Sequence, residues 1–84
     1  MYYVYIIECQ EDLSWYIGYT ADLKRRINDH KKGVGCKTTS AKKDWKLIYY
    51  EAYINQSDAL GREKFLKSGS GRKYLKKQLR NYLK

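Results

Sequence analysis

Apolar residues gather in three short runs that are rich in aromatic and β-branched side chains. The first run, Tyr2–Cys9, is apolar at both odd and even positions, which predicts a strand with little exposure to solvent. After the polar residues 10–14, the run 15–19 lies close enough to fold back on the first as an antiparallel hairpin. The third run, Trp45–Tyr53, predicts a third strand.

Between the strands, the spacing of apolar residues changes to a helical period. Leu23, Ile27 and His30 recur at intervals of four and three, Thr20 or Asp22 can cap the helix, and Gly33 ends it after about Lys32. Residues 33–44 have glycines, hydroxyl residues and lysines without periodicity, so they are predicted to form a mobile basic loop. A solvated connector and a segment that contacts substrate fit this loop equally well.

Two further helices are predicted after the third strand. Ser57 is the expected cap of a helix that runs to about Lys67, and the small residues 68–71 interrupt the chain. A last helix begins at about Ser70, and its apolar stripe comprises Leu75, Leu79, Tyr82 and Leu83. The order β-β-α-β-α-α predicts an α+β fold, in which helices pack on one face of a three-stranded antiparallel sheet.

Size and charge narrow the class of protein. The 84 residues suffice for one compact core, so residues 1–84 are expected to form a single domain. Eighteen Lys and Arg against nine Asp and Glu give a formal charge of +9, which favours nucleic acid as the partner but does not imply that the protein cuts it. A basic protein that associates with ribosomes or another assembly also fits this charge.

The cysteines and the N-terminal residues exclude two other classes. Cys9 and Cys36 stand apart and the chain has one histidine, so no zinc site is expected and both cysteines are predicted to be reduced thiols. Glu8 and the charged residues 10–12 interrupt the first apolar run, which argues against a membrane span or a secretory signal. We therefore expect a cytoplasmic protein.

Three charged or ionisable residues occupy unusual helical positions. Arg26 and His30 fall within about 60° of Leu23, at the edge of the buried stripe of the first predicted helix. Glu63 shares the apolar face of the second predicted helix with Ala59 and Leu66. A carboxylate at such a position needs a neutralising cation, which could be Arg26, a lysine or a bound metal. On this ground alone a salt bridge is favoured over a metal.

Tyrosines and a glycine add a second group of candidates. Tyr5 and Tyr16 lie on the two strands of the predicted hairpin, so both phenols can reach one face. Because the chain has ten tyrosines, packing is the more common role for any one of them. Gly18 lies two residues after Tyr16 on the same strand, where a glycine often marks a close approach by another group.

These residues together form a recognisable signature. Tyr3-Val4-Tyr5 is followed, eleven residues after Tyr5, by Tyr16-Ile17-Gly18, then by Leu23-x-x-Arg26, His30 and, on a later helix, Glu63. The pattern resembles the GIY-YIG endonuclease superfamily, in particular its short stand-alone, UPF0213-like, single-domain members. Tyr3 and Val4 replace the glycine and isoleucine of the family name, and no late asparagine can be aligned, since Gln78 and Asn81 are poor candidates.

The resemblance implies a metal-dependent endonuclease that hydrolyses DNA phosphodiester bonds with low sequence specificity. It implies that Glu63 holds one Mg²⁺ or Mn²⁺, which suits a single carboxylate, and that Arg26 stabilises charge on the phosphate. Tyr5 is the implied general base, with Tyr16 as a second phenol and His30 as an orienting group. The substrate could be branched or damaged DNA, in repair or recombination. The alternative is a nucleic-acid-binding module that retains the fold without cutting.

Basic residues outside the signature are candidates for contact with nucleic acid. They share exposed helical faces or the predicted basic loop, where the alternative role is that of ordinary solvated charges. These residues are Lys24, Arg25, Lys37, Lys42, Lys43, Arg72 and Lys73.

Overall fold

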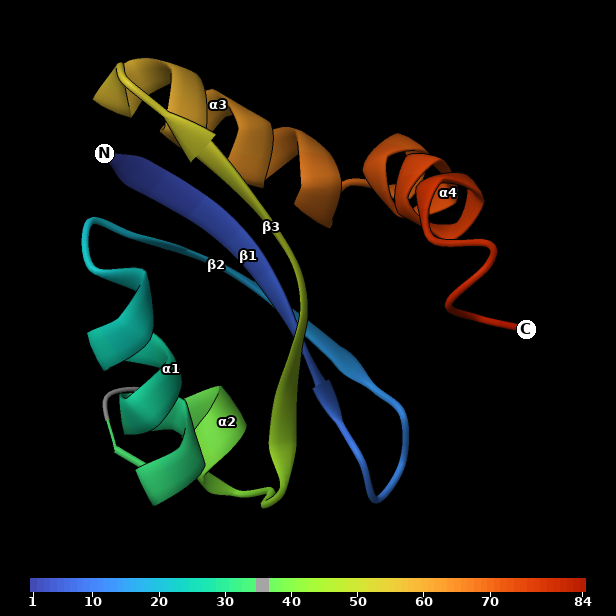
Figure 1. The fold of residues 1–84 in the computed structure, drawn as a ribbon. Helices are drawn as coiled ribbons and strands as arrows, with labels where there is room; N and C mark the ends of the chain where they lie inside the picture. Colours follow the sequence, from blue (N-terminus) through green and yellow to red (C-terminus); the bar gives the residue numbers. More distant parts are fainter. Residues whose placement is uncertain (35–36) are drawn as a thin grey trace.

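The computed structural model describes residues 1–34 and 37–84, so the thiol expected at Cys36 lies outside the described residues. Its elements, in chain order, are β1 (Tyr2–Cys9), β2 (Trp15–Thr20), α1 (Leu23–Lys32), α2 (Lys37–Ser40), β3 (Trp45–Tyr53), α3 (Gln56–Lys67) and α4 (Gly69–Gln78). Figure 1 shows these elements around one sheet. The predicted α+β fold and the order β-β-α-β-α-α are confirmed, with the single-turn α2 as an addition.

The sheet has the strand order β2-β1-β3, and both pairings are antiparallel. The predicted hairpin of β1 and β2 is confirmed, and in it Tyr5 lies opposite Gly18. On the other side of β1, Tyr5 lies opposite Tyr50, and the pairing with β3 shifts its register between Ile6 and Ile7. Gly18, Tyr5 and Tyr50 therefore form a row across the sheet.

Helices cover both faces of this sheet, so the prediction that they cover one face was wrong. Val4 and Ile6 of β1 pack with α3 and α4 through Ala59, Leu66 and Leu75. The alternate residues of β1 form a second core with α1 and β3, whose members are Tyr5, Ile7, Cys9, Ile27 and Trp45. The reason is that β1 is apolar on both faces, and both must be shielded from water.

The helix ends refine the predicted boundaries. Of the two candidate caps of α1, Asp22 accepts a hydrogen bond from the backbone of Arg25, and Gly33 ends the helix at a φ of 76°. The cap of α3 is Asn55, whose side chain accepts from the Asp58 amide at 3.2 Å; the prediction of Ser57 was therefore wrong. An asparagine two residues earlier provides the same acceptor and adds two residues to the helix.

The remaining corrections concern the basic loop and the last apolar stripe. Residues 37–40 of the predicted loop form α2, and its Thr39 is fully buried. In the last stripe, Leu75 lies in α4 and Leu79 caps it, but Tyr82 and Leu83 lie beyond the helix. Tyr82 instead donates a 2.6 Å hydrogen bond to the Glu8 carboxylate on β1. A polar contact therefore replaces the expected apolar one.

A bidentate ion pair fixes α3 against the sheet. Arg62 Nε and an Arg62 terminal nitrogen donate to the two oxygens of Glu51 on β3 at 2.9 and 3.1 Å. The hydroxyls of Tyr49 and Tyr53 donate to the same carboxylate, each at 2.6 Å. Burial raises the pKa of Glu51, but these hydrogen bonds outweigh it and hold the pKa below its ordinary value. The pair sets the rotation of α3, and with it the direction of Glu63.

A glycine permits the tight junction of α3 and α4. A Cβ atom at Gly71 would lie 1.9 Å from the Phe65 carbonyl oxygen and 2.5 Å from the Leu66 Cα, both of them backbone atoms that cannot turn away. At Gly69, two residues earlier in the same helix, a Cβ would meet nothing within 4 Å. The two glycines therefore differ in function although both begin α4.

We expect Gly71→Ala to destabilise the protein by about 2 kcal/mol or more, because the backbones of α3 and α4 must separate. The matched variant Gly69→Ala should be neutral or stabilise by up to ~1 kcal/mol, since alanine favours a helix. Thermal and urea unfolding of both variants measure this. Equal effects of the two substitutions would contradict the assignment of Gly71 to a close backbone contact.

Candidate active site

A buried chain of hydrogen bonds joins β1, α1 and α2. Tyr5 Oη lies 2.6 Å from His30 Nε2, and His30 Nδ1 lies 2.8 Å from Thr39 Oγ1. Tyr5 and His30 are each only 1% exposed, and Thr39 is fully buried. Trp45 Nε1 donates to the Thr39 carbonyl at 2.9 Å, which holds α2 in place from β3. Four segments of the chain are thus fixed around one imidazole.

Gly18 creates the space that the Tyr5 phenol occupies. A Cβ atom at position 18 would lie 2.4 Å from both Cζ and Oη of Tyr5, which is far inside van der Waals contact. The sequence predicted that another group approaches this glycine, and that group is the Tyr5 ring on the neighbouring strand. Glycine at this position lets the phenol lie against β2 and reach His30.

Tyr16 completes an aromatic cluster on the same face of the sheet. Its ring centroid lies 5.2 Å from that of His30 and 6.5 Å from that of Tyr5, with both pairs tilted. In the register it lies opposite Ile7, so it points to the same side as Tyr5. Tyr16 is partly exposed, in contrast to Tyr5, which is 1% exposed.

Arg26 lies one helical turn before His30, and its positive charge is close enough to lower the pKa of the imidazole. It is half-buried, and with Thr20, Arg25 and Asp29 it lines a hollow of about 260 Å³ at the start of α1. The predicted position at the edge of the buried stripe agrees with this half-buried state. A guanidinium so placed can present two donors to an anion that enters the hollow.

The environment keeps His30 uncharged. Burial lowers its pKa below the ordinary 6.5, and the positive charge of Arg26 lowers it further, against an opposing effect of Asp29. A neutral imidazole donates at one nitrogen and accepts at the other, and the hydroxyls of Tyr5 and Thr39 can each take either role. His30 can therefore exchange a proton with Tyr5 along their hydrogen bond.

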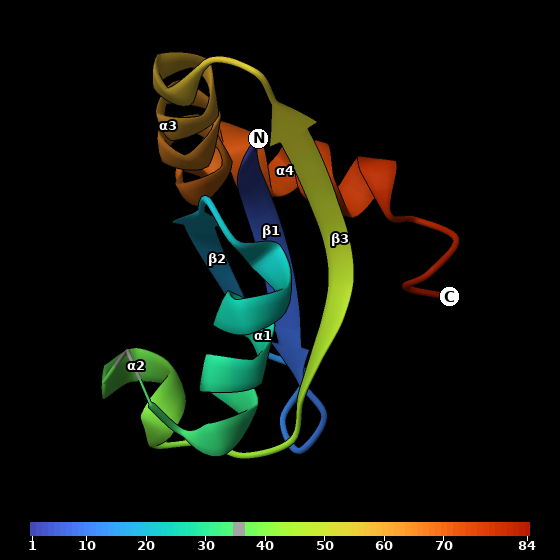
Figure 2. The same ribbon diagram turned by 60° about the vertical axis from the view of Figure 1, so that its left-hand side comes forward.

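Glu63 approaches from a different element and is not part of this hydrogen-bonded chain. It lies on α3, which packs on the opposite face of the sheet, and Figure 2 shows β2 running between α3 and α1. Its carboxylate is 3.1 Å from Lys67 Nζ, one turn further along α3, and its side chain is 20% exposed. Of the three cations expected for Glu63, the structure supplies a lysine.

The donor set fits only one kind of metal site. Within residues 1–34 and 37–84, no three His, Cys, Asp or Glu residues gather closely enough to hold an ion. A partly exposed single carboxylate fits Mg²⁺, which retains waters and takes its other ligands from substrate phosphate. The described residues thus do not fit a metal held by three or more of their own side chains, but Glu63 fits an ion that arrives with a phosphodiester.

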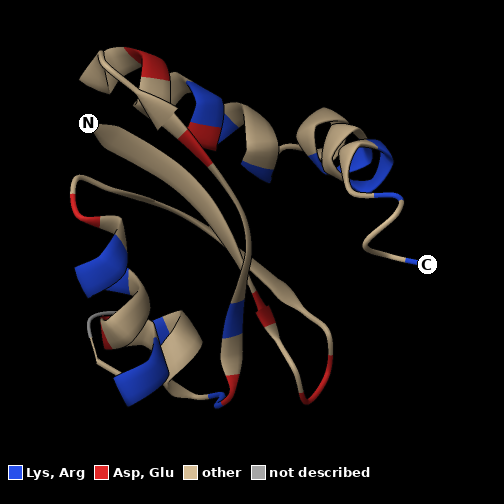
Figure 3. Ribbon diagram, viewed as in Figure 1, with Lys and Arg blue, Asp and Glu red and all other residues tan. Residues whose placement is uncertain are grey.

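The basic candidates divide between the two faces of the sheet. All seven are exposed, and Figure 3 shows positive charge both on α1 and on α4, on opposite sides of the sheet. Lys24 and Arg25 lie on α1, whereas Arg72 and Lys73 lie on α4. Lys37, Lys42 and Lys43 lie on or near α2, and Lys42 is paired with Asp12 at 2.7 Å. Only the α1 and α2 groups lie on the face that holds Tyr5.

Comparison with known proteins identifies the family of this chain. The model of the GIY-YIG catalytic domain matches residues 1–78. The chain belongs to the GIY-YIG family. A UPF0213 protein of Haloquadratum walsbyi is 42% identical over 80% of this chain and 74% of its own length. A UPF0213 protein of Staphylococcus saprophyticus is 40% identical over 89% of this chain and 90% of its own length.

A solved structure agrees with these relatives. The solution NMR structure of a UPF0213 protein from Bacillus halodurans is 41% identical, covers 98% of this chain and 85% of its own, and superposes with a TM-score of 0.56. The resemblance inferred from the sequence signature is thus confirmed. GIY-YIG domains are nuclease domains that act on nucleic acid and in general use a divalent metal. None of the helices in the described parts of the chain could cross a lipid bilayer.

The GIY-YIG signature does not contain Thr39, the residue that sequence reasoning missed. Its hydroxyl is the second partner of His30, and it lies in a helix of four residues. One turn of helix gives no periodicity, so no pattern marked it as buried. The only available signal was Trp45, five residues after Ser40, whose indole needed a buried partner.

The burial of His30 predicts a pH dependence of stability near neutrality. Because its pKa is lowered in the folded protein, the unfolded chain binds this proton more readily. The free energy of unfolding is at its full value above about pH 6.5, where His30 is neutral in both the folded and the unfolded chain. It decreases as the pH falls below that value, by at most ~1.4 kcal/mol per pH unit. The midpoint temperature of thermal unfolding should therefore decrease as the pH is lowered from about 7.5 to about 5.5.

His30→Gln is the matched variant, because glutamine can hydrogen-bond but does not titrate. It should be less stable than the native protein but show a flat midpoint over the same pH range. Glu8 and Glu51, with pKa values below 4.5, lose their contribution only at lower pH and do not interfere. A midpoint that falls equally in both proteins would assign the effect to another group.

Proposed function

We propose that this GIY-YIG protein is a metal-dependent endonuclease that hydrolyses DNA phosphodiester bonds in the cytoplasm with low sequence specificity. The observation that carries the proposal is the meeting of Tyr5, Tyr16 and His30 on one face of the sheet, beside the half-buried Arg26. A domain that only binds nucleic acid does not need two phenols and an imidazole around one point. Charge of +9 supports a polyanionic substrate.

Tyr16 is the better candidate for the general base. A free phenol has a pKa near 10, about three units above neutral pH, so cations must stabilise the phenolate. Tyr5 is almost fully buried and engaged with His30, whereas Tyr16 is partly exposed and can meet a water molecule. We therefore assign proton abstraction to Tyr16, and to Tyr5 and His30 the positioning of the Tyr16 ring.

Arg26 and Glu63 have complementary roles in the proposal. Arg26 donates to the scissile phosphate and stabilises the negative charge that grows in the transition state. Glu63 approaches from α3, which contacts the edge strand β2, so in the proposal the phosphate spans that edge and Glu63 would hold the Mg²⁺ or Mn²⁺ ion that arrives with it. The ion, when bound, supplies positive charge to a phosphate oxygen and to the leaving 3′ oxygen.

A non-catalytic nucleic-acid-binding module is the second candidate, and one observation favours it. The ion pair with Lys67 already neutralises Glu63, so the carboxylate has a structural explanation without a metal. Such an exposed pair within a helix contributes only about 0.3–0.5 kcal/mol, however, and a metal can displace the lysine at small cost. The two candidate functions predict different effects on DNA cleavage when the Glu63 carboxylate is removed.

Supercoiled plasmid incubated with Mg²⁺ or Mn²⁺ should be nicked or linearised, and Glu63→Ala should lower the rate by about 10²-fold or more. Lys67→Ala is the matched control, because it breaks the same ion pair and leaves the carboxylate. It should retain activity within a few-fold. If both variants cut as well as the native protein, Glu63 has no catalytic role; if the native protein binds DNA but never cuts it, the second candidate holds.

The assignment of the base predicts an asymmetry between the two phenols. Tyr16→Phe should lower the cleavage rate by about 10²- to 10⁴-fold. Tyr5→Phe should lower stability by about 1–3 kcal/mol, because the buried His30 Nε2 loses its hydrogen bond to Tyr5, and should cause a smaller loss of rate. Single-turnover cleavage and thermal unfolding of both variants measure this. The reverse asymmetry would make Tyr5 the base.

A further inference from the structure

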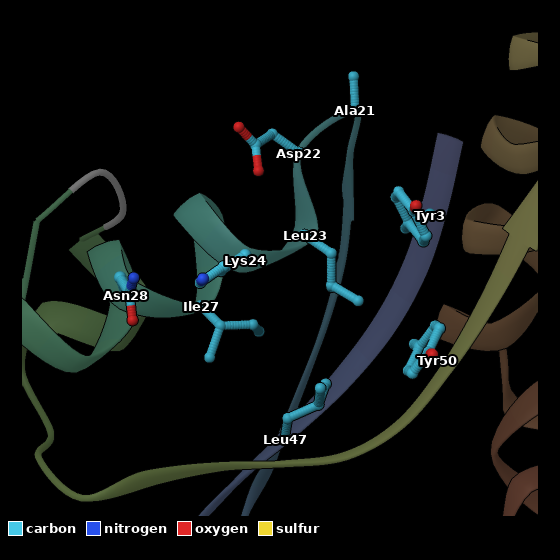
Figure 4. A pocket seen from close by; sticks show the side chains of 9 residues that line it. All are labelled: Tyr3, Ala21, Asp22, Leu23, Lys24, Ile27, Asn28, Leu47 and Tyr50. Carbon is cyan, nitrogen blue, oxygen red and sulfur yellow. The ribbon is translucent and has the colours of Figure 1, made fainter. Parts of the chain in front are cut away.

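A second hollow lies beside the candidate active site, on the same face of the sheet. Its volume is about 520 Å³, within the range of small-ligand pockets. Figure 4 shows α1 on one side of it, from which Leu23 and Ile27 point toward the sheet. Tyr3 of β1 and Tyr50 of β3 lie on the other side, and Leu47 forms the floor. The residues of the GIY-YIG signature that the proposed chemistry uses do not include Leu47 or Tyr50.

Of the two aromatic rings at the mouth of this hollow, that of Tyr50 is open to solvent. Tyr50 is 53% exposed, although it stands on the sheet face that α1 covers. Its ring meets that of Tyr3 edge to face, with centroids 6.1 Å apart. An edge-to-face pair leaves the faces of one ring uncovered by its partner. A flat aromatic ligand can therefore stack there.

The register places this hollow next to the proposed chemistry. Tyr50 lies directly opposite Tyr5 across the β1–β3 pairing, and Tyr3 precedes Tyr5 by two residues on the same face. Along α1, Ile27 of the hollow follows Arg26 immediately. A nucleic acid strand with one phosphate at Arg26 would place a neighbouring nucleotide at Tyr3 and Tyr50.

We propose that this hollow binds one unpaired nucleobase of the DNA substrate, which makes DNA with unpaired nucleotides, such as a single strand or a flap, the preferred substrate class. The occupant is a base because the hollow joins apolar walls and the exposed ring of Tyr50, while Lys24 at its rim can meet the attached phosphate. Asn28 adds an amide at the same rim. A paired base cannot enter, because its faces are already stacked in the duplex. The inference rests on the proposed function in its choice of DNA.

The test compares two probes with equal numbers of phosphates. A labelled oligothymidine and an abasic strand of the same length are titrated with protein in EDTA, so that binding is measured without cleavage. The native protein should bind oligothymidine about 5- to 150-fold more tightly than the abasic strand, the range expected for stacking of one base. Tyr50→Ala should remove this preference and leave the affinity for the abasic strand unchanged.

Two further variants control for shape and for surface apolarity. Tyr50→Phe keeps the ring and should keep the preference. Ile54→Ala removes an 85% exposed apolar side chain outside the hollow and should have no effect. Equal affinity of the native protein for both strands, or a preference that survives Tyr50→Ala, would overturn the inference. If the protein shows the unpaired-base preference but cuts neither plasmid nor a single-stranded oligonucleotide with Mg²⁺ or Mn²⁺, this inference stands and the nuclease activity is refuted. If it cuts either DNA without the preference, the nuclease activity stands and this inference is refuted.

Discussion

The hydrogen bond between Tyr5 and His30 is the constraint on which the arrangement of this face depends. It joins the central strand to α1 in a place where neither group meets water, and an unpaired hydroxyl or imidazole there would cost about 1–3 kcal/mol. Gly18 must be a glycine to let the phenol reach the ring, and Thr39 must be buried to satisfy the other nitrogen. One bond thus fixes β2 and α2 as well as its own partners.

Much of this arrangement could be predicted from the sequence. The three strands follow from β-branched and aromatic runs, and the end of α1 follows from Gly33. The position of Arg26 beside the buried stripe follows from helical angles alone. The two-sided apolar pattern of β1 also implied that helices cover both faces, a consequence that the predicted one-sided packing did not take into account. The error concerned the layers and not the elements.

Other features could not be predicted because they depend on contacts between distant residues. Helix α2 has four residues, too few for any period, and it is held by Trp45 and His30. The partner of Glu63 was undetermined because a lysine one turn away and a metal satisfy the same local pattern. The hollow at Tyr50 arises only when β3 pairs with β1, so no segment of the chain shows it alone.

The strand order β2-β1-β3 has a consequence for how the protein folds. Pairing β1 with β2 closes a loop of a few residues, whereas pairing β1 with β3 encloses both β2 and the α1–α2 segment. Closure entropy grows with loop length, and distant pairings slow folding. We expect the β1–β2 hairpin to form early, with Tyr5, Tyr16 and Gly18 already in register. The aromatic part of the site would then be a product of local nucleation, and the imidazole would join it as the chain condenses.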